Sequence, residues 1–210
     1  MNKKTKILRI IQTLDKSYGG PSNAIIDNSL ALIKSGFKVD ILTYDNKKNY
    51  YLNNKKIKVI NKGPAYGRFT FSLNLLFWII KNKKKYDLFI IHGIWHFSTL
   101  IARFILKNKY FVYIHGGLDP YFAKEFFKCL KKKIYWTLIE KKNLLNAKAI
   151  LLTNDIEKNQ LKKTFVETNG LIKKIVNYGI SKPIFNKKIA LKKFNNKFAK
   201  LKNKKFLLFL

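Results

Sequence analysis

The three histidines of this chain all follow short apolar runs that have the pattern of β-strands. His92 and His96 enclose the segment His92-Gly-Ile-Trp-His96, and His115 begins the segment His115-Gly-Gly-Leu-Asp-Pro120. A histidine side chain can donate to or accept from a substrate hydroxyl, and it can stabilise developing charge. In open parallel sheets, ligands bind outside the carboxyl ends of the strands. The sequence therefore predicts that the three imidazoles converge along one rim of a sheet.

A glycine pair precedes the first predicted helix, in the segment Tyr18-Gly-Gly-Pro-Ser-Asn23. Gly19 and Gly20 would let backbone N–H groups approach an anion closely, and the dipole of the helix favours negative charge at that end. An ordinary flexible turn is the alternative interpretation. The G-x-G-x-x-G dinucleotide fingerprint is absent, which argues against a nicotinamide-dependent enzyme.

Other polar residues after predicted strands have structural explanations of their own. Asn154 and Glu157 have the spacing of a capping box, which accounts for Glu157 at least as well as a substrate contact does. For His92, a structural role with its hydrogen bonds made inside the protein is as well supported as a functional role. A metal site built on the histidines is a competing interpretation, but it lacks regular ligand spacing and cysteine support, since Cys129 is the single cysteine.

Several chemistries have no motif here. There is no Asp-x-Asp pair for a metal-bound diphosphate, and no two carboxylates have a spacing that suggests a hydrolytic pair. The G-x-S-x-G elbow and the P-loop are also absent. We therefore expect no metal and no bound cofactor.

The elements that must position these residues alternate between strands and helices, which predicts an α/β fold with a Rossmann-like parallel sheet flanked by helices. Helices are predicted from about Pro21 to Gly36, over 72–81 and 99–106, and over 123–145, the last with Phe126, Phe127, Leu130, Ile134 and Leu138 along it. Strands are predicted over 7–14, 39–43, 58–60, 88–92, 111–115, 149–153 and 173–176.

Composition changes near residue 181. The segment 181–204 is rich in Lys and Asn and has Pro183 near its start, as in a linker between domains. The apolar run 206–210 has the pattern of a core strand. We therefore expect one domain over 1–180, and a linker with the first strand of a second, missing domain over 181–210.

The chain carries 44 basic and 11 acidic residues, a net charge of +33. Codon bias towards Lys and attraction to an anionic membrane surface both explain this charge. Nucleic acid is not expected, because the lysines are spread along the chain and no nucleic-acid-binding motif is present.

The start of the chain lacks the apolar core of a signal peptide, and no run is long enough to span a bilayer, so we expect a cytoplasmic protein. The segment 69–80, followed by Lys81 and Lys83 to Lys85, has the pattern of an interfacial helix for a membrane surface; a core-facing helix is the favoured alternative.

Taken in order, these segments resemble the amino-terminal domain of the family 4 glycosyltransferases, also called glycosyl transferases group 1, which have the GT-B fold. The resemblance runs through nearly the whole chain. Its motifs are Gly19 to Asn23, the helix and strand from Leu30 to Asp40, the segments beginning at His92 and His115, the segment 147–157, and Val176-Asn-Tyr-Gly-Ile180 at the hinge. Tyr178 departs from the pattern, because many relatives have asparagine before this glycine.

The resemblance implies retaining transfer of a sugar from a nucleotide-sugar donor to an acceptor hydroxyl, without an obligatory metal. It places Gly19 and Gly20 near the donor diphosphate and His115, the implied catalytic residue, at the transferred sugar. It also implies sugar or acceptor contacts, which the following residues could make: Asn23, His92, Trp95, Gly116, Asp119 and Glu157. The expected acceptor is a glycan or lipid-linked molecule in envelope polysaccharide or lipopolysaccharide synthesis.

Two other functions remain open at this stage. The chain could be a non-catalytic remnant or a split-gene binding module that needs a separate donor-binding chain. It could also share its fold with nucleotide-sugar epimerases, although the contexts of Trp95 and Asp119-Pro120 fit a transferase better.

Overall fold

The computed structural model describes residues 4–46, 56–123, 126–179, 186–201 and 204–207 of the 210-residue chain. The chain divides into two compact units, 1–180 and 181–210. The larger unit contains all the candidate site residues named above.

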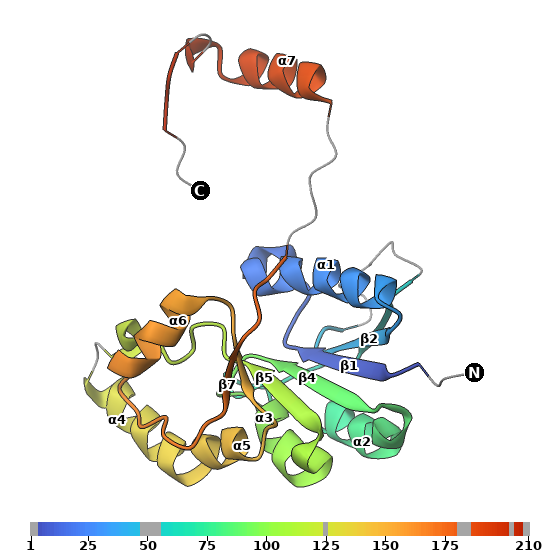
Figure 1. The fold of residues 1–210 in the computed structure, drawn as a ribbon, viewed down its shortest axis with the longest axis vertical. Helices are drawn as coiled ribbons and strands as arrows, with labels where there is room; N and C mark the ends of the chain where they lie inside the picture. Colours follow the sequence, from blue (N-terminus) through green and yellow to red (C-terminus); the bar gives the residue numbers. More distant parts are fainter. Residues whose placement is uncertain (1–3, 47–55, 124–125, 180–185, 202–203, 208–210) are drawn as a thin grey trace. The chain divides into compact units, whose positions relative to one another are not determined.

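A seven-stranded parallel sheet with the order β3-β2-β1-β4-β5-β6-β7 forms the centre of the larger unit (Figure 1). All seven predicted strands are present, so the predicted α/β, Rossmann-like fold class is confirmed. Their bounds are β1 Lys6–Ile11, β2 Lys38–Thr43, β3 Lys58–Asn61, β4 Leu88–His92, β5 Tyr110–Tyr113, β6 Ile150–Leu152 and β7 Lys173–Ile175.

Strand β1 ends at Ile11, three residues before the predicted end at Leu14. The polar residues Gln12 and Thr13 follow Ile11, and beyond them side chains accept the hydrogen bonds of the backbone N–H groups. The N–H of Leu14 donates to the Asp45 carboxylate at 3.0 Å, and the N–H of Asp15 donates to the Thr13 hydroxyl. These contacts turn the chain out of the sheet and towards the first helix.

The helices also follow the predicted pattern, with two interruptions. The π-helical segments Ala102–Leu106 and Trp136–Glu140 continue α3 and join α4 to α5, respectively. The α-helices are α1 Gly20–Lys34, α2 Leu73–Asn82, α3 Phe97–Ile101, α4 Phe126–Tyr135, α5 Lys141–Leu145, α6 Asp155–Gln160 and α7 Lys187–Lys197. Short 3₁₀ turns lie at Lys16–Tyr18, Lys83–Lys85, Lys107–Lys109, Pro120–Ala123, Leu161–Lys163 and Ala199–Leu201.

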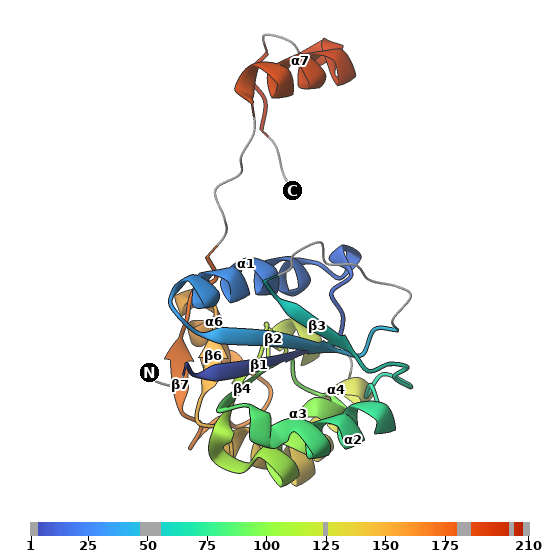
Figure 2. The ribbon, with the colours of Figure 1, turned by 90° about the vertical axis from the view of Figure 1, so that its right-hand side faces the viewer.

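The two faces of the sheet are covered differently. Helix α1 lies on one face, and α2, α3 and α4 lie on the other (Figure 2). The period of two along β1 assigns Leu8 and Ile10 to the larger core on the side of α2 and α3, and Ile11 to the smaller core beneath α1. Arg9 therefore lies on the α1 side of the sheet.

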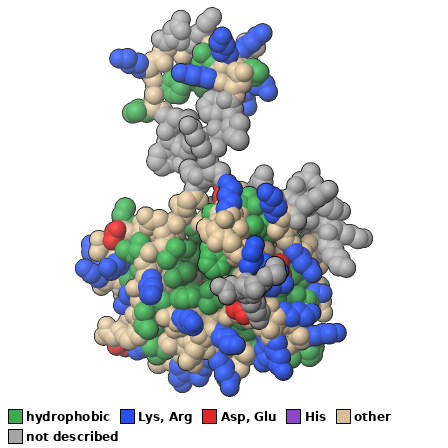
Figure 3. Space-filling view, turned by 45° about the vertical axis from the view of Figure 1, so that its right-hand side comes forward, with side chains coloured by type: hydrophobic (Ala, Val, Ile, Leu, Met, Phe, Trp, Pro, Cys, Tyr) green, Lys and Arg blue, Asp and Glu red, His purple; other side chains and the backbone are tan. Residues whose placement is uncertain are grey.

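Some apolar residues along the helices remain exposed rather than packed. On α4 and the following π-helical turn, Leu130, Ile134 and Leu138 are between 46% and 60% exposed, while Trp136 is buried. On α2, Leu75 and Ile79 are buried, as the core-facing alternative predicted, but Leu73, Phe77 and Ile80 form an exposed stripe. Lys and Arg side chains are scattered among apolar ones over the face shown in Figure 3.

The second unit contains α7, whose N-cap Asn186 accepts hydrogen bonds from the N–H groups of Lys188 and Ile189. Residues 204–207 have no regular secondary structure, so the strand expected from Phe206 is not formed there; residues 208–210 lie outside the described part. Without a neighbouring strand, an extended segment has no ladder to join. Phe206 stacks on Phe194 instead, with ring centroids 5.6 Å apart. The assignment of 181–210 to the start of a second domain stays a prediction.

A buried carboxyl group holds the loop after β4. Glu140 is fully buried, and its Oε1 accepts a hydrogen bond from the Trp95 N–H at 3.3 Å. Its Oε2 accepts from the Asn143 amide at 3.1 Å and lies 3.2 Å from the Thr99 hydroxyl, whose one proton can be donated to the His96 carbonyl at 2.8 Å. A protonated Glu140 can then donate to Thr99. Burial raises the pKa of Glu140 to about 7.

This raised pKa predicts a loss of stability with rising pH. The folded pKa lies above the ordinary value of 4.5, so between these values the folded state holds a proton that the unfolded state has lost. The free energy of unfolding should therefore fall from about pH 4.5 to pH 7. Glu140→Gln should remove this dependence. Between pH 5 and pH 8, the free energy of unfolding of the wild type should therefore fall by about 1 to 3 kcal/mol more than that of the variant.

Denaturant unfolding of both proteins at pH 5 and pH 8 measures this difference. Glu167→Gln is the matched control, because Glu167 is an exposed carboxylate paired with Lys141 at 2.6 Å. Parallel pH dependences for wild type and Glu140→Gln would contradict a protonated Glu140.

Candidate functional site

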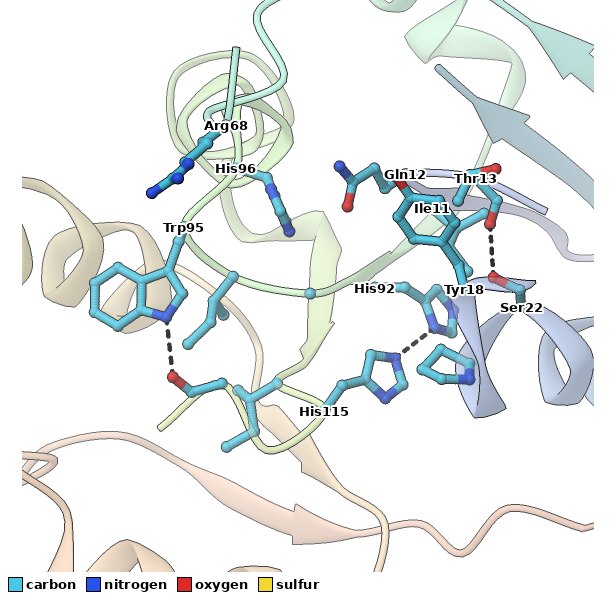
Figure 4. Close-up of a pocket in the computed structure, with 15 residues that line it drawn as sticks. Ile11, Gln12, Thr13, Tyr18, Ser22, Arg68, His92, Trp95, His96 and His115 are labelled. Carbon is cyan, nitrogen blue, oxygen red and sulfur yellow. Dashed lines mark hydrogen bonds between the residues drawn. The ribbon is translucent and has the colours of Figure 1, made fainter. Parts of the chain in front are cut away.

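The carboxyl ends of β1, β4 and β5 meet at a pocket of about 300 Å³. All three histidines line it, so the structure brings His92, His96 and His115 together at one edge of the sheet. Figure 4 shows Trp95, His96 and Arg68 on one side of this pocket and Gln12, Thr13, Tyr18 and Ser22 on the other. A second pocket, of about 480 Å³, lies beside the start of α1 and includes Gly20, Asn23, Thr153 and Tyr178. His115 lines both pockets.

The loop between β1 and α1 leaves the start of the helix without a side-chain cap. Gly19 occupies the N-cap position with φ 91°, which glycine adopts without strain. Ser22 donates to the Thr13 carbonyl at 3.0 Å, and the Asn23 amide donates to the Gly19 carbonyl at 3.3 Å. The first N–H groups of α1 and its dipole therefore form a surface suited to an anion.

The loop after β4 depends on a close approach of its own residues. A Cβ on Gly93 would lie 3.0 Å from the His96 ring, so glycine leaves the space for this imidazole. Trp95 has a left-handed backbone with φ 67°, and its indole N–H donates to the Gly117 carbonyl at 2.9 Å. His96 Nδ1 is buried and has no hydrogen-bond partner among the described residues. Strained non-glycine conformations of this kind concentrate at functional sites.

His115 is the second strained residue of the site, with φ 47°. Its Nε2 lies 3.0 Å from Nδ1 of His92 and 3.0 Å from the hydroxyl of Tyr178. Burial, reinforced by the charge of Arg9, lowers the pKa of His115 to about 4. The same two causes, burial first, hold the pKa of His92 well below its ordinary value. Both imidazoles are therefore neutral at physiological pH and act through hydrogen bonds rather than through charge.

His92 contacts His115 through Nδ1 and Arg9 through Nε2. Arg9 donates to His92 Nε2 from Nε at 3.2 Å and contacts it from Nη2 at 3.1 Å. The Arg9 Nη1 donates to the hydroxyl of Ser29 and to the carbonyl of Ile25 in α1. The ring of Tyr113 stacks against His92 and His115, with centroids 5.2 and 5.4 Å apart.

Three of the predicted site residues shape the loops. Glu157 is buried and accepts from the Gly116 N–H at 2.8 Å, and from the Thr153 N–H at 2.6 Å and hydroxyl at 2.9 Å. Asn154 accepts from the Glu157 N–H, which forms half of the expected capping box. Asp119 accepts from the Tyr121 N–H. Glu157 thus joins the loops after β5 and β6, and neither carboxylate is part of the lining of the two pockets.

The structure places the other predicted residues at or beside the pockets: Gly19, Gly20, Asn23, His92, Trp95 and His115. Sequence reasoning did not assign Arg9, Arg68, Tyr113 or Tyr178 to the site. The position of a charged residue inside an apolar strand is a usable signal for Arg9, whereas the sequence marks Tyr178 only as a departure from the family pattern. Within the described ranges, no group of three His, Cys, Asp or Glu side chains could hold a metal ion.

Comparison with known proteins identifies the family of this chain. A model of Glycosyltransferase Family 4 matches residues 18–175, whereas no curated protein matches the chain. A glycosyltransferase from Rickettsia africae ESF-5 is similar in structure, with a TM-score of 0.62, 18% identity, and coverage of 93% of this chain and 50% of that one. A sucrose-phosphate synthase from Thermosynechococcus elongatus is also similar, with a TM-score of 0.59, 15% identity, and coverage of 90% and 53%.

These likenesses show the fold, and the chain spans about half the length of both solved chains. The matched region contains the three histidines and the glycine pair, which lie at the carboxyl edge of a Rossmann-like sheet. The family model covers most of the sequence, and the chain therefore belongs to glycosyltransferase family 4.

Proposed function

We propose that this chain is the acceptor-side half of a retaining glycosyltransferase that moves a hexosyl group from a nucleotide-sugar to an acceptor hydroxyl. The observation that carries the proposal is the convergence of His115, His92 and the uncapped start of α1 on adjoining pockets. A neutral imidazole and free backbone N–H groups are the groups needed to bind sugar oxygens and a diphosphate. The proposal that the anomeric configuration is retained, and that no metal is needed, is supported by the family alone.

Each predicted residue has a place in this proposal. His115 contacts the transferred sugar, and Gly19 and Gly20 let the donor diphosphate approach the start of α1. Trp95 and Asn23 face the acceptor from the two adjoining pockets. His92, Gly116, Asp119 and Glu157 support these contacts from behind.

Under this proposal, donor recognition belongs to a second domain that begins in 181–210. The similar solved chains are about twice as long as the part that this chain covers. The chain alone would then bind acceptor without catalysing transfer. A split-gene module or a degraded remnant is the alternative, and it predicts that no longer protein containing this sequence transfers sugar.

The proposed acceptor is a glycan or lipid-linked intermediate of polysaccharide or lipopolysaccharide synthesis, reached at the cytoplasmic face of the membrane. No described helix has the length and apolarity of a bilayer span. The exposed stripe of Leu73, Phe77 and Ile80 on α2 runs towards the lysines at 81 and 83–85. Apolar side chains beside lysines suit the interface of an anionic membrane.

Replacement of His115 tests the catalytic assignment. In the longest natural polypeptide that contains this sequence, His115→Ala should lower kcat with nucleotide-sugar donors by about 100-fold, because a donor to the developing charge is lost. His115→Gly is the matched control for the left-handed backbone, and it should lose as much activity. Normal transfer by His115→Ala would contradict the role, and normal transfer by His115→Gly alone would assign the effect to the backbone.

Membrane attachment has a separate test. Ile80→Ser should weaken co-sedimentation with anionic phosphatidylglycerol vesicles at low salt by several-fold, because it removes about 1 kcal/mol of apolar burial. Ile156→Ser on α6 is the matched control, since it changes an even more exposed isoleucine, 70% against 48% for Ile80, without altering charge. Absence of vesicle binding by the wild-type chain, or equal losses in both variants, would contradict docking through α2.

A further inference from the structure

Arg9 is a buried cation whose described partners include no carboxylate. It is 2% exposed, and it lies in β1 between Leu8 and Ile10. Burial of a guanidinium group without a counter-charge is costly, so an apolar residue would be expected here. Only three of the 44 basic residues are arginines, yet Arg9 and Arg68 both lie at the site. The presence of a buried arginine despite this cost points to a task that its donor geometry performs.

The contact between Arg9 and His92 has one chemical direction. A guanidinium group donates hydrogen bonds and cannot accept them. The two Arg9 nitrogens, at 3.2 and 3.1 Å, therefore require a lone pair on His92 Nε2. The proton of neutral His92 must then lie on Nδ1.

The direction of this hydrogen bond also determines which nitrogen of His115 carries the proton. Nδ1–H of His92 lies 3.0 Å from Nε2 of His115 and 3.3 Å from the Tyr178 hydroxyl. Two N–H groups that faced each other at 3.0 Å would repel, so Nε2 of His115 must carry a lone pair. The Tyr178 hydroxyl, 3.0 Å from the same nitrogen, can donate to it as well. The proton of neutral His115 is left on Nδ1, whose contact in the described structure is a long one of 3.4 Å to Tyr178.

We propose that Arg9 is a positioning residue that fixes the tautomers of His92 and His115, so that His115 presents Nδ1–H to the substrate as a hydrogen-bond donor. The ligand atom that this arrangement suits is an acceptor oxygen, such as a sugar hydroxyl oxygen or an oxygen of the leaving phosphate. This use in transfer rests on the proposed function, whereas the tautomers are properties of the chain by itself.

Nitrogen NMR tests the tautomers directly, because the chain has only three histidines. Long-range ¹H–¹⁵N spectra of the ¹⁵N-labelled chain identify the protonated nitrogen of each ring, with a His96→Gln variant for assignment. We expect both His92 and His115 to be neutral and protonated on Nδ1 between pH 6 and 8. A proton on Nε2 of either ring in the wild-type chain would overturn the proposal.

Variants then test whether Arg9 is the cause. Arg9→Met should convert His92 to a mixture of tautomers, and His115 should follow it. Arg103→Met is the matched control, because it removes the same charge from a side chain that packs on Phe104, and the tautomers should stay as in wild type. Tyr178→Phe should also leave them unchanged. A His115 tautomer that changes in Tyr178→Phe but not in folded Arg9→Met would overturn the proposal.

Two further outcomes are separated by this design. The wild-type spectra test the proposal even if Arg9→Met fails to fold, as judged by circular dichroism. If the tautomers are as expected but no acceptor or donor produces transfer, the proposed function fails while the tautomer assignment stands.

Discussion

The open part of one sheet face is the constraint on which this site depends. Helix α1 packs over β1 and β2, where Ile25 contacts the apolar cluster that includes Ile11 and Ile41. Beyond β1, the same face carries His92 and Tyr113 at the ends of β4 and β5, followed by His115. Here His92 and His115 line pockets, while Tyr113 is buried and stacks against both of them. Under the proposed function, this row of polar rings is where the ligand binds.

The loops that carry this row are held by two buried carboxyl groups. Glu140 secures the loop of Trp95, and Glu157 joins the backbone of Gly116 to Thr153. Each carboxyl accepts backbone N–H groups, which would otherwise be buried without partners. The strained backbones of Trp95 and His115 persist because these contacts determine the loops from several sides.

The fold was largely predictable from sequence, because short β-branched runs alternating with helical segments leave few arrangements other than a parallel sheet. The predicted end of β1 was wrong, since an apolar pattern does not reveal that Asp45 takes over the hydrogen bond of Leu14. The meeting of the histidines was predictable from topology alone. The contact of Tyr178 with His115 was not, because it joins residues 63 positions apart through ring orientation.

Buried polar residues were the least predictable part of the site. Arg9 and Glu140 sit within apolar segments, and only the assembled packing shows which face each occupies and which partners it meets. Residues 30 to 90 positions away supply several of those partners, as with the pairs Arg9–His92 and Glu140–Trp95. Sequence periodicity describes one element at a time, so it gives no information on such pairings.

The low pKa values of the paired imidazoles have a consequence for the electric field of the pocket. With His115 titrating at about 4, its ring adds no positive charge near neutral pH, and among the described residues the guanidinium groups of Arg9 and Arg68 lie at the site. The lowered pKa of Arg9, about 10, still lies well above the neutral range, so Arg9 keeps its charge there. The attraction of this buried charge for an anionic ligand is thus constant from mildly acidic to mildly alkaline conditions.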